Sequence, residues 1–143
     1  MTVGLKPLLD AYGIEYVHAT TLQAISGSGF PGLSHAEMYD NCVPYIGQEE
    51  DKMEEEAAKI LGTFDGSGIV HTDMKVSAIC NRVPVSNGHA ICVSVKLKNW
   101  DGDVEKAKQV NWIFGRNVRW ICLMQAGVGR SSVISHVHMF SFS

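Results

Sequence analysis

The clearest hydrophobic pattern in the chain is a strict alternation that begins after Gly88. Over residues 89–97 one face carries mainly apolar side chains and the other carries polar or small ones; the apolar face consists of His89, Ile91, Val93, Val95 and Leu97. A period of two residues is that of a β-strand with one buried face. The pattern therefore predicts a half-buried strand that starts at His89, with this histidine on the core side.

A second alternating segment precedes the first and is expected to pair with it. Residues 74–83 place four side chains on one face, namely Val76, Ala78, Cys80 and Arg82. The Asn-Gly pair at 87–88 is a strong signal for a two-residue turn, because both residue types tolerate positive φ. We therefore expect a β-hairpin that sets Arg82 opposite Val93 and puts Arg82 and His89 on the same face.

An arginine on a buried face needs a partner, because removing its charge from water costs on the order of several kcal/mol unless an anion or hydrogen-bond acceptors replace the water. Two interpretations of Arg82 are open. In the commoner one it pairs with an acidic side chain of the protein, and His89 is an ordinary core histidine. In the other, the partner is a substrate. Pro84 cannot donate to a sheet, which indicates an edge strand or a bulge at this point.

Two segments have apolar residues at helical spacing, and each is followed by a glycine that can end a helix. Residues 2–12 predict a short amphipathic helix whose regular part begins near Pro7. Residues 49–61 predict the clearest helix, with an apolar stripe made of Met53, Ala57, Ile60 and Leu61. Glu49 and Lys52 share a side of this helix, either as an exposed ion pair, which is more usual, or as two charges that face a cleft.

The remaining segments have weaker patterns. Residues 14–25 are rich in β-branched and aromatic side chains and predict a largely buried strand. Residues 26–32 are rich in glycine and form a loop, which is either a tight connection or a place where the backbone approaches a ligand. A short helical turn is expected at 36–41. A helix is expected from Val104 toward Phe114, with Asp103 as its N-cap. Residues 116–143 have no sustained period, and no structure is predicted there.

Length and composition indicate one globular domain with a hydrophobic core, since the chain has 143 residues of which 45% are hydrophobic. The net charge of −3 and the scattered positions of the basic residues give no surface for nucleic acid, so no such partner is expected. The longest apolar run, at 110–124, is interrupted by Arg116 and Arg119, so no membrane span is expected either.

The cysteines and histidines predict reduced thiols and no metal site. None of the four cysteines is closely paired with another, and no signal peptide is present; the cysteines are Cys42, Cys80, Cys92 and Cys122. A cytoplasmic location with reduced thiols is therefore expected. His136 and His138 are two residues apart, as metal ligands on a strand can be, but no cluster of cysteines or acids completes a site.

Four segments, in order along the chain, resemble one family, the aspartate-semialdehyde dehydrogenases of the archaeal and fungal branch. Residues 5–8 resemble the helix that follows the catalytic cysteine, and 23–27 resemble the active-site loop. Residues 40–52 resemble the segment with the acidic and basic substrate contacts, and 80–89 the segment with the family's arginine and histidine. The resemblance covers roughly residues 2–109, and such long matches in the correct order are far more specific than a single short motif.

The resemblance implies a role for each matching residue. In the family a cysteine attacks the aldehyde, the thiohemiacetal passes a hydride to NADP, and phosphate cleaves the thioester to give aspartyl phosphate; the physiological direction is the reverse. By resemblance, His89 is the general acid and base, a role that imidazole suits because it titrates near neutral pH. Arg82 would hold the substrate carboxylate by a bidentate fork. Glu49 would bind the amine, Lys52 the phosphate, and Gln23 would orient the covalent intermediate.

The implied cofactor is NADP, with Ser26 and Gly27 at positions that approach its nicotinamide end. Two parts of the family pattern are absent from the sequence: the glycine-rich nucleotide-binding unit, and the Asn-Cys motif with the nucleophile, whose position falls just before Met1. We therefore expect this polypeptide alone to be inactive.

The expected fold is α+β, a mainly antiparallel sheet with helices packed on one face, like the C-terminal domain of glyceraldehyde-3-phosphate dehydrogenase but truncated. Residues 1–109 would form the catalytic and dimerisation domain, and 110–143 a divergent tail. The resemblance implies a small-molecule substrate and a homo-oligomer. Two alternatives to part of an aspartate-semialdehyde dehydrogenase are a non-catalytic dimerisation module and a related reductase of another acyl phosphate or acyl thioester.

Overall fold

The structure, a computed structural model, describes residues 1–103, 105–107, 109–110, 124–125 and 135–141, the last two ranges as backbone only. The elements in chain order are α1 (Thr2–Tyr12), β1 (Ile14–Gln23), the 3₁₀ turn η1 (Ile25–Ser28), α2 (His35–Met38), α3 (Glu49–Ile60), β2 (Thr63–Phe64), β3 (Ile69–Val70), β4 (Lys75–Arg82), β5 (His89–Leu97), β6 (Met124–Gln125) and β7 (Ser135–Ser141).

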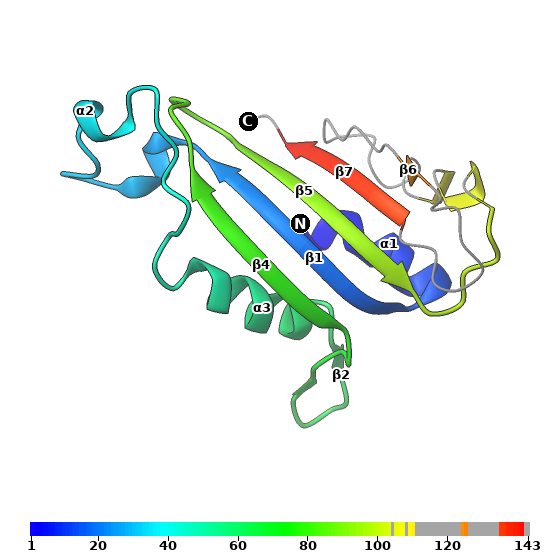
Figure 1. The fold of residues 1–143 in the computed structure, drawn as a ribbon. Helices are drawn as coiled ribbons and strands as arrows, with labels where there is room; N and C mark the ends of the chain where they lie inside the picture. The colour runs from blue at the N-terminus through cyan, green and yellow to red at the C-terminus, as the bar shows by residue number, and fades with distance from the viewer. Residues whose placement is uncertain (104, 108, 111–123, 126–134, 142–143) are drawn as a thin grey trace.

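The main sheet has the strand order β4-β1-β5-β7-β6, as Figure 1 shows for its long strands. Strand β1 pairs parallel with β4, whereas every other pair in this sheet is antiparallel. The two-stranded unit of β2 and β3 forms a separate ribbon. The predicted strands over 74–83 and 89–97 are confirmed as β4 and β5.

The predicted β-hairpin between β4 and β5 is wrong, because β1 lies between these two strands. The connection over 83–88 does not close a two-residue turn. Its backbone carbonyls instead accept hydrogen bonds from the residues that follow β1: the Ala24 N–H donates to Gly88 O at 3.1 Å and the Ile25 N–H to Val85 O at 2.8 Å. Arg82 therefore pairs with Gln23 and not with Val93.

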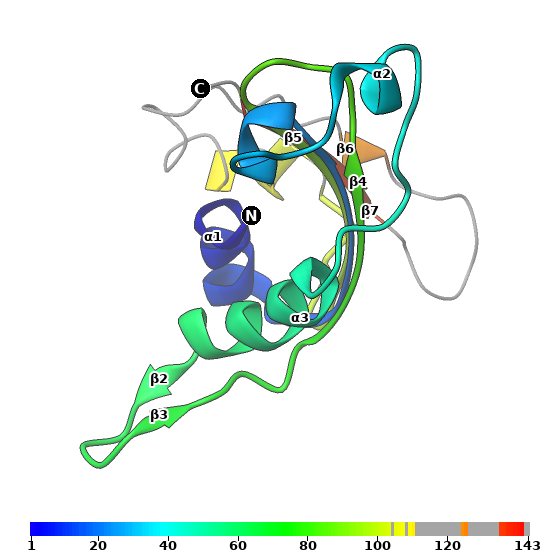
Figure 2. The same ribbon diagram turned by 90° about the vertical axis from the view of Figure 1, so that its left-hand side faces the viewer.

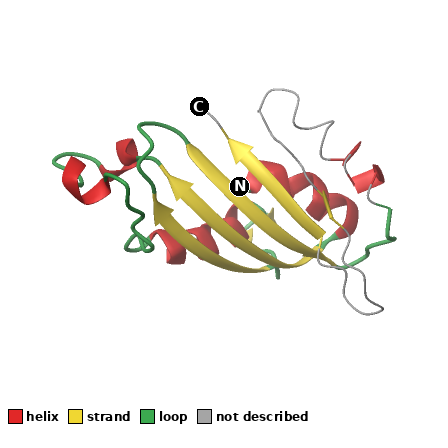
Figure 3. Ribbon diagram, turned by 45° about the horizontal axis from the view of Figure 1, so that its top comes forward, coloured by secondary structure: helices red, strands yellow, loops and turns green. Residues whose placement is uncertain are grey.

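Helices α1 and α3 cover only one face of the sheet. Seen along the sheet edge in Figure 2, the sheet curves and both helices lie on its concave side; Figure 3 shows the strands side by side with the helices behind them. The core is formed where helices and sheet meet, and its fully buried side chains include Leu5, Leu8, Ile14, Val17, Val93 and Val95. The predicted fold class, α+β with a mainly antiparallel sheet and helices on one face, is confirmed.

Helix α1 begins at Thr2 and not near Pro7, as the sequence had suggested. Pro7 has no N–H to donate to the carbonyl of Val3 four residues before it, but Val3 is exposed, so water can satisfy that carbonyl. The predicted end is confirmed: Gly13 has a positive φ of 67° and its N–H donates to Leu9 O. Gly4 and Leu5, before Pro7, are already buried, so the packing of this face, and not local propensity, determines where the helix starts.

Outside the sheet, the short predicted elements have mixed outcomes. Helix α3 ends at Ile60, whose side chain is 63% exposed and so does not belong to the predicted apolar stripe. Asp103 caps the next helical segment, since its Oδ1 accepts from Lys106 N at 3.0 Å; residues 111–114 of that predicted helix lie outside the described residues. No described helix is long and apolar enough to cross a lipid bilayer.

Strand β7 was not predicted. It pairs with β5 over seven positions, from His89 opposite Ser141 to Val95 opposite Ser135. A strand of seven residues is too brief to stand out as a sustained period in the sequence of 116–143. The division of the chain at residue 109 stays a prediction.

The outer edge of β4 is protected by helix α3. An edge strand has unpaired N–H groups that invite pairing with another chain. Here the Cys80 N–H donates to Glu50 Oε1 at 2.9 Å, and the Ala78 N–H donates to Glu54 Oε1 at 3.2 Å. The next outward N–H, that of Arg82, donates to Val43 O at 2.8 Å. The bonds from Glu50 and Glu54 hold α3 along β4, and the bond from Val43 holds the preceding loop at the end of this strand.

Replacing Glu54 with alanine is expected to lower the free energy of unfolding by about 1 kcal/mol, because the Ala78 N–H loses a charged acceptor. Urea denaturation followed by circular dichroism measures this. Glu55→Ala, which removes an exposed carboxylate from the same helix, is the control and should change the value by less than about 0.5 kcal/mol. Equal stability of the two variants would show that the bond at the strand edge contributes nothing.

Candidate functional site

Three of the predicted site residues form one row across the end of the sheet. Gln23, the last residue of β1, is paired with Arg82 of β4 on one side and with His89 of β5 on the other. Residues that are paired across neighbouring strands point to the same face. The predicted shared face of Arg82 and His89 is therefore confirmed, although by a different pairing from the one expected.

The guanidinium of Arg82 is buried and held by neutral oxygen atoms. The residue is 5% exposed. Its Nη1 donates to Ala24 O at 2.8 Å and to Gln23 Oε1 at 3.4 Å. Within the described residues, none of the ion pairs involves Arg82. An arginine has five N–H donors, so this positive charge has the capacity to bind an anion in addition to its two protein acceptors.

His89 differs from its prediction in exposure but is fixed in orientation. It lies on the covered side of the sheet, yet at the sheet end, where its side chain is exposed. Its Nδ1 accepts a hydrogen bond from the Ala24 N–H at 3.1 Å. In the neutral imidazole the proton must then be on Nε2, which is the donor left for another molecule.

The loop after β1 packs on the arginine and the histidine. A Cβ atom on Gly27 would lie 2.7 Å from Arg82 Nη1, so a side chain here would displace the guanidinium, whereas its 3.5 Å distance from His89 Cε1 is an ordinary contact. The neighbouring Ser26 is exposed, and its N–H donates to Ser86 O at 3.2 Å. The glycine-rich segment thus packs closely on two of the predicted site residues; whether it also approaches a ligand stays a prediction.

Glu49 and Lys52 lie in the first turn of α3 and form an ion pair with 3.9 Å between Lys52 Nζ and Glu49 Oε1. Both side chains are more than a third exposed, so the pair contributes little to stability. Glu50, between them, is bonded to the Cys80 backbone two residues before Arg82. The first turn of α3 therefore lies beside the end of β4, at the same end of the sheet as the row.

Sequence reasoning missed two contributors to the site. Ala24 holds Arg82 with its carbonyl and His89 with its N–H; a backbone group leaves no signal in the side-chain pattern. Thr21 is buried, and its Oγ1 accepts from Gln23 Nε2 at 3.3 Å. The spacing of two residues between Thr21 and Gln23 in a predicted strand was the available signal.

The described cysteines are not placed to attack a molecule in this row. Cys42 is exposed in the loop before α3, and Cys92 is on the opposite face of the sheet from His89. Cys80 is fully buried; burial raises the pKa of its thiol, against which a hydrogen bond with Thr21 acts more weakly. Cys122 lies outside the described residues. Within the described part, no three His, Cys, Asp or Glu side chains are grouped to hold a metal.

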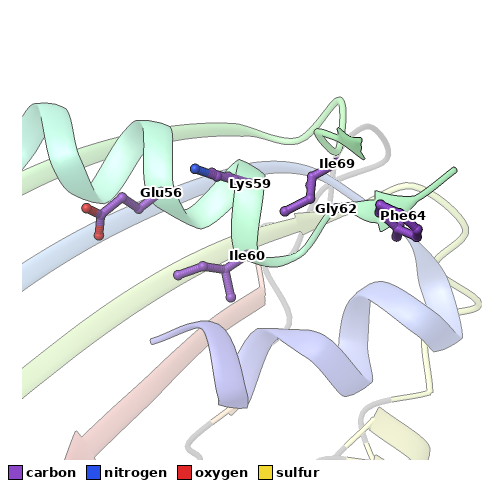
Figure 4. Close-up of a pocket in the computed structure, with 6 residues that line it drawn as sticks. All are labelled: Glu56, Lys59, Ile60, Gly62, Phe64 and Ile69. Carbon is purple, nitrogen blue, oxygen red and sulfur yellow. The ribbon is translucent and has the colours of Figure 1, made fainter. Parts of the chain in front are cut away.

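Two hollows elsewhere on the surface are separate from this row. One, of about 440 Å³, is lined by Ile60 at the end of α3 and by Phe64 and Ile69 of the β2–β3 ribbon (Figure 4). The other, of about 580 Å³, is at the far end of the sheet and is lined by Tyr16, Lys75 and Lys96 among others. None of the predicted site residues lines either hollow.

Comparison with known proteins gives one family. Residues 5–116 match the family described as "Semialdehyde dehydrogenase, dimerisation domain". The aspartate-semialdehyde dehydrogenase of Candida albicans is 50% identical over 113 residues, and that of Schizosaccharomyces pombe is 46% identical over 113 residues. These matches cover 73% and 77% of this chain but only 31% and 32% of the two enzymes. The chain thus spans about a third of the length of the curated relatives that it matches.

Solved structures agree with this result. The Candida albicans enzyme, solved with NADP, superposes with a TM-score of 0.66 at 47% identity, over 75% of this chain and 31% of that one. Aspartate semialdehyde dehydrogenase II of Vibrio cholerae superposes with a TM-score of 0.72 over 98% of this chain and 53% of that one. Since the identity in the second case is 23%, it supports the fold alone.

Replacing Gly27 with alanine is expected to displace the Arg82 guanidinium from Ala24 O and to lower the free energy of unfolding by about 1 to 3 kcal/mol, as overpacking does. The NMR signal of the Arg82 side chain and a denaturation curve measure the two effects. Gly47→Ala is the matched control, because a Cβ there meets nothing within 4 Å. An unchanged Arg82 signal in the Gly27 variant would contradict the close packing of the loop on the arginine.

Proposed function

The chain belongs to the semialdehyde dehydrogenase family through its dimerisation domain, and on this premise we propose that it forms the substrate-binding part of an NADP-dependent aspartate-semialdehyde dehydrogenase. The reaction interconverts aspartyl phosphate and aspartate semialdehyde, a step of lysine, threonine and methionine biosynthesis. The proposal extends to this chain an activity that belongs to relatives about three times its length.

One observation carries the proposal: the buried charge of Arg82 has neutral oxygen partners, and none of the ion pairs among the described residues involves it. Such a charge is costly unless an anion also binds it. A substrate carboxylate fits, since the planar guanidinium binds carboxylates by two parallel hydrogen bonds. The commoner interpretation of Arg82, an acidic partner within the protein, has no support among the described contacts.

His89 and Gln23 have positions that suit the chemistry of an acyl group held by Arg82. In the neutral ring the Nε2–H of His89 can donate a hydrogen bond to the oxygen of the reacting carbonyl. As general acid the ring would act as imidazolium, giving its Nε2 proton to that oxygen, and the neutral ring so formed would take the proton back as general base when the carbonyl re-forms. Gln23 is the residue between the two, so its carboxamide is next to whatever Arg82 and His89 bind together. We assign His89 as general acid and base and Gln23 as the residue that orients the covalent intermediate.

Glu49 and Lys52 would bind the two remaining charged groups of the reactants. Glu49 would accept the substrate ammonium, and Lys52 would take phosphate as a compact positive charge. Their mutual ion pair at 3.9 Å is exposed and weak, so exchanging it for substrate and phosphate costs little.

The described residues fit one end of NADP. Ser26 and Gly27 are exposed and next to His89, so they would contact the nicotinamide, and the cofactor would supply the hydride acceptor or donor when bound. The Gly-x-Gly-x-x-Gly spacing of Gly27, Gly29 and Gly32 overlaps the turn η1 and is followed only by the four-residue helix α2, so it does not open a helix that could hold the pyrophosphate. The nucleophile has no candidate in the row either, because Cys80 is buried as a thiol and Cys92 is on the other face. We therefore propose that this chain alone is inactive.

The test is a chimera in which residues 5–116 replace the matching segment of the Candida albicans enzyme. Phosphate-dependent oxidation of aspartate semialdehyde is followed by the absorbance of the reduced cofactor. The chimera should be active and the chain alone inactive. Arg82→Lys should lower kcat/KM about a hundredfold through the loss of the bidentate contact, and His89→Asn should lower kcat about a hundredfold or more.

Lys59→Ala, at an exposed position near the end of α3, is the control and should leave the rate unchanged. Full activity of the His89→Asn chimera would exclude the assigned role. The related-reductase alternative is distinguished by Glu49→Gln: if it affects the amino substrate and succinate semialdehyde equally, Glu49 does not recognise an amine, and a substrate other than aspartate semialdehyde is favoured.

We propose in addition that the chain forms a homodimer through the face of the sheet that α1 and α3 do not cover. A homodimer is expected both of the enzyme and of the alternative, a non-catalytic dimerisation module. Neither α1 nor α3 lies on the convex face (Figure 2), and this face presents exposed apolar side chains, Leu22 of β1 and Ile79 of β4. Exposed apolar positions on an uncovered sheet mark an interaction surface.

Replacing both Leu22 and Ile79 with lysine is therefore expected to shift the chain from dimer to monomer at micromolar concentration, because the charges would be buried in the interface without partners. Sedimentation equilibrium measures the mass. Ile60→Lys, at a more exposed apolar position on helix α3, is the control. A wild-type chain that sediments as a monomer would refute the proposed dimer.

A further inference from the structure

The buried polar side chains of the described residues form a single group. They are Thr21, Gln23 and Arg82, which are 2%, 9% and 5% exposed. All three lie on the covered face of the sheet in two consecutive rows, since Thr21 is paired with Cys80 and Gln23 with Arg82. Buried polar groups are usually hydrogen-bonded to one another, so each side chain in this group is expected to donate to or accept from the next.

The contacts run from the arginine inwards to the threonine. Arg82 Nη1 donates to Gln23 Oε1 at 3.4 Å, and Gln23 Nε2 donates to Thr21 Oγ1 at 3.3 Å. A carboxamide has an accepting end and a donating end. If Gln23 were rotated by half a turn, its NH₂ group would face the guanidinium, donor against donor, and its oxygen would face the Thr21 hydroxyl.

Among the contacts of the described residues, Thr21 is the partner of the carboxamide on the inner side, and its hydroxyl accepts from the NH₂ end. Its hydroxyl is almost completely removed from water, so it cannot touch a substrate. Its backbone carbonyl accepts from Asn81 Nδ2 at 3.1 Å, which fixes the strand next to it. The Cys80 thiol, whose residue is paired with Thr21 across the strands, donates to Met53 Sδ at 3.5 Å, and the Thr21 side chain lowers the pKa of this thiol. When the hydroxyl donates to that sulfur, its lone pairs are free for Gln23 Nε2.

We propose that Thr21 is a positioning residue that holds the carboxamide of Gln23 with its oxygen toward Arg82, so that the guanidinium keeps its remaining N–H donors turned to the substrate carboxylate. This rests on the proposed function for the nature of the ligand but not for the orientation itself. The role belongs to the hydroxyl group and not to the volume of the side chain.

The test compares Thr21→Val, which keeps the shape and removes the hydroxyl, with Thr21→Ser, which keeps the hydroxyl. In this chain the NMR signals of the Gln23 side-chain NH₂ group report its hydrogen bond. Thr21→Val should shift them and speed their exchange with water about tenfold or more, whereas Thr21→Ser should leave them near the wild-type values. Thr63→Val, in the exposed ribbon strand β2, is the control and should change nothing.

In the chimeric enzyme the same substitutions separate positioning from a merely structural effect. Thr21→Val should raise KM for aspartate semialdehyde about tenfold with a smaller change in kcat, and Thr21→Ser should restore it to within about twofold. If Thr21→Val does not fold, Thr21→Ala removes the hydroxyl without adding bulk and is measured in the same way.

Equal NMR signals in the valine variant and the wild type, or equal defects in the valine and serine variants, would overturn the proposal. An inactive chimera would count against the proposed function, while the NMR comparison would still decide the role of Thr21.

Discussion

The buried charge of Arg82 is the constraint on which the rest of this structure depends. Its two protein acceptors, Ala24 O and Gln23 Oε1, carry no formal charge, and neutral acceptors compensate a buried guanidinium only in part. One of the two acceptor residues, Ala24, also binds the histidine, because its N–H donates to His89 Nδ1. The positive charge of Arg82, which its protein partners compensate only in part, thus lies where a bound anion would complete the compensation. Such an arrangement is typical of binding sites and not of structural ion pairs.

The position of β1 between β4 and β5 explains why the site is at this end of the sheet. Among the described strands, β1 is the one that pairs with both the arginine strand and the histidine strand, and its last residue, Gln23, is opposite both side chains. The loop that follows β1 then returns over that row, and Gly27 allows it to approach both side chains. Helix α3, fastened to the outer edge of β4 by Glu50 and Glu54, brings a charged first turn to the same place.

The strands around the site could be predicted from the sequence, but their partners could not. The alternation over 89–97 is local and was sufficient for β5, whereas Asn87 and Gly88 expressed a local turn preference that the pairing of β1 with both neighbours overrode. Gln23, Arg82 and His89 were found through the family resemblance, and their common row needed the three-dimensional register. Ala24 acts through its backbone and had no signal at all. Ile60 fits the helical spacing of the apolar stripe but is exposed, because the spacing within a helix does not predict how far the neighbouring strand extends along it.

The parallel pairing of β1 with β4 has a consequence for how this site arises during folding. The bond between Arg82 and Gln23 closes a loop of 59 residues, and that between Ala24 and His89 one of 65. Contacts so distant along the chain form late and cooperatively, because the entropy of loop closure is lost before they can stabilise anything. A change that prevents the connecting segment from folding, even far from the row, would therefore remove all of these contacts together. The contacts of Arg82 and His89 form only when the intervening residues have folded.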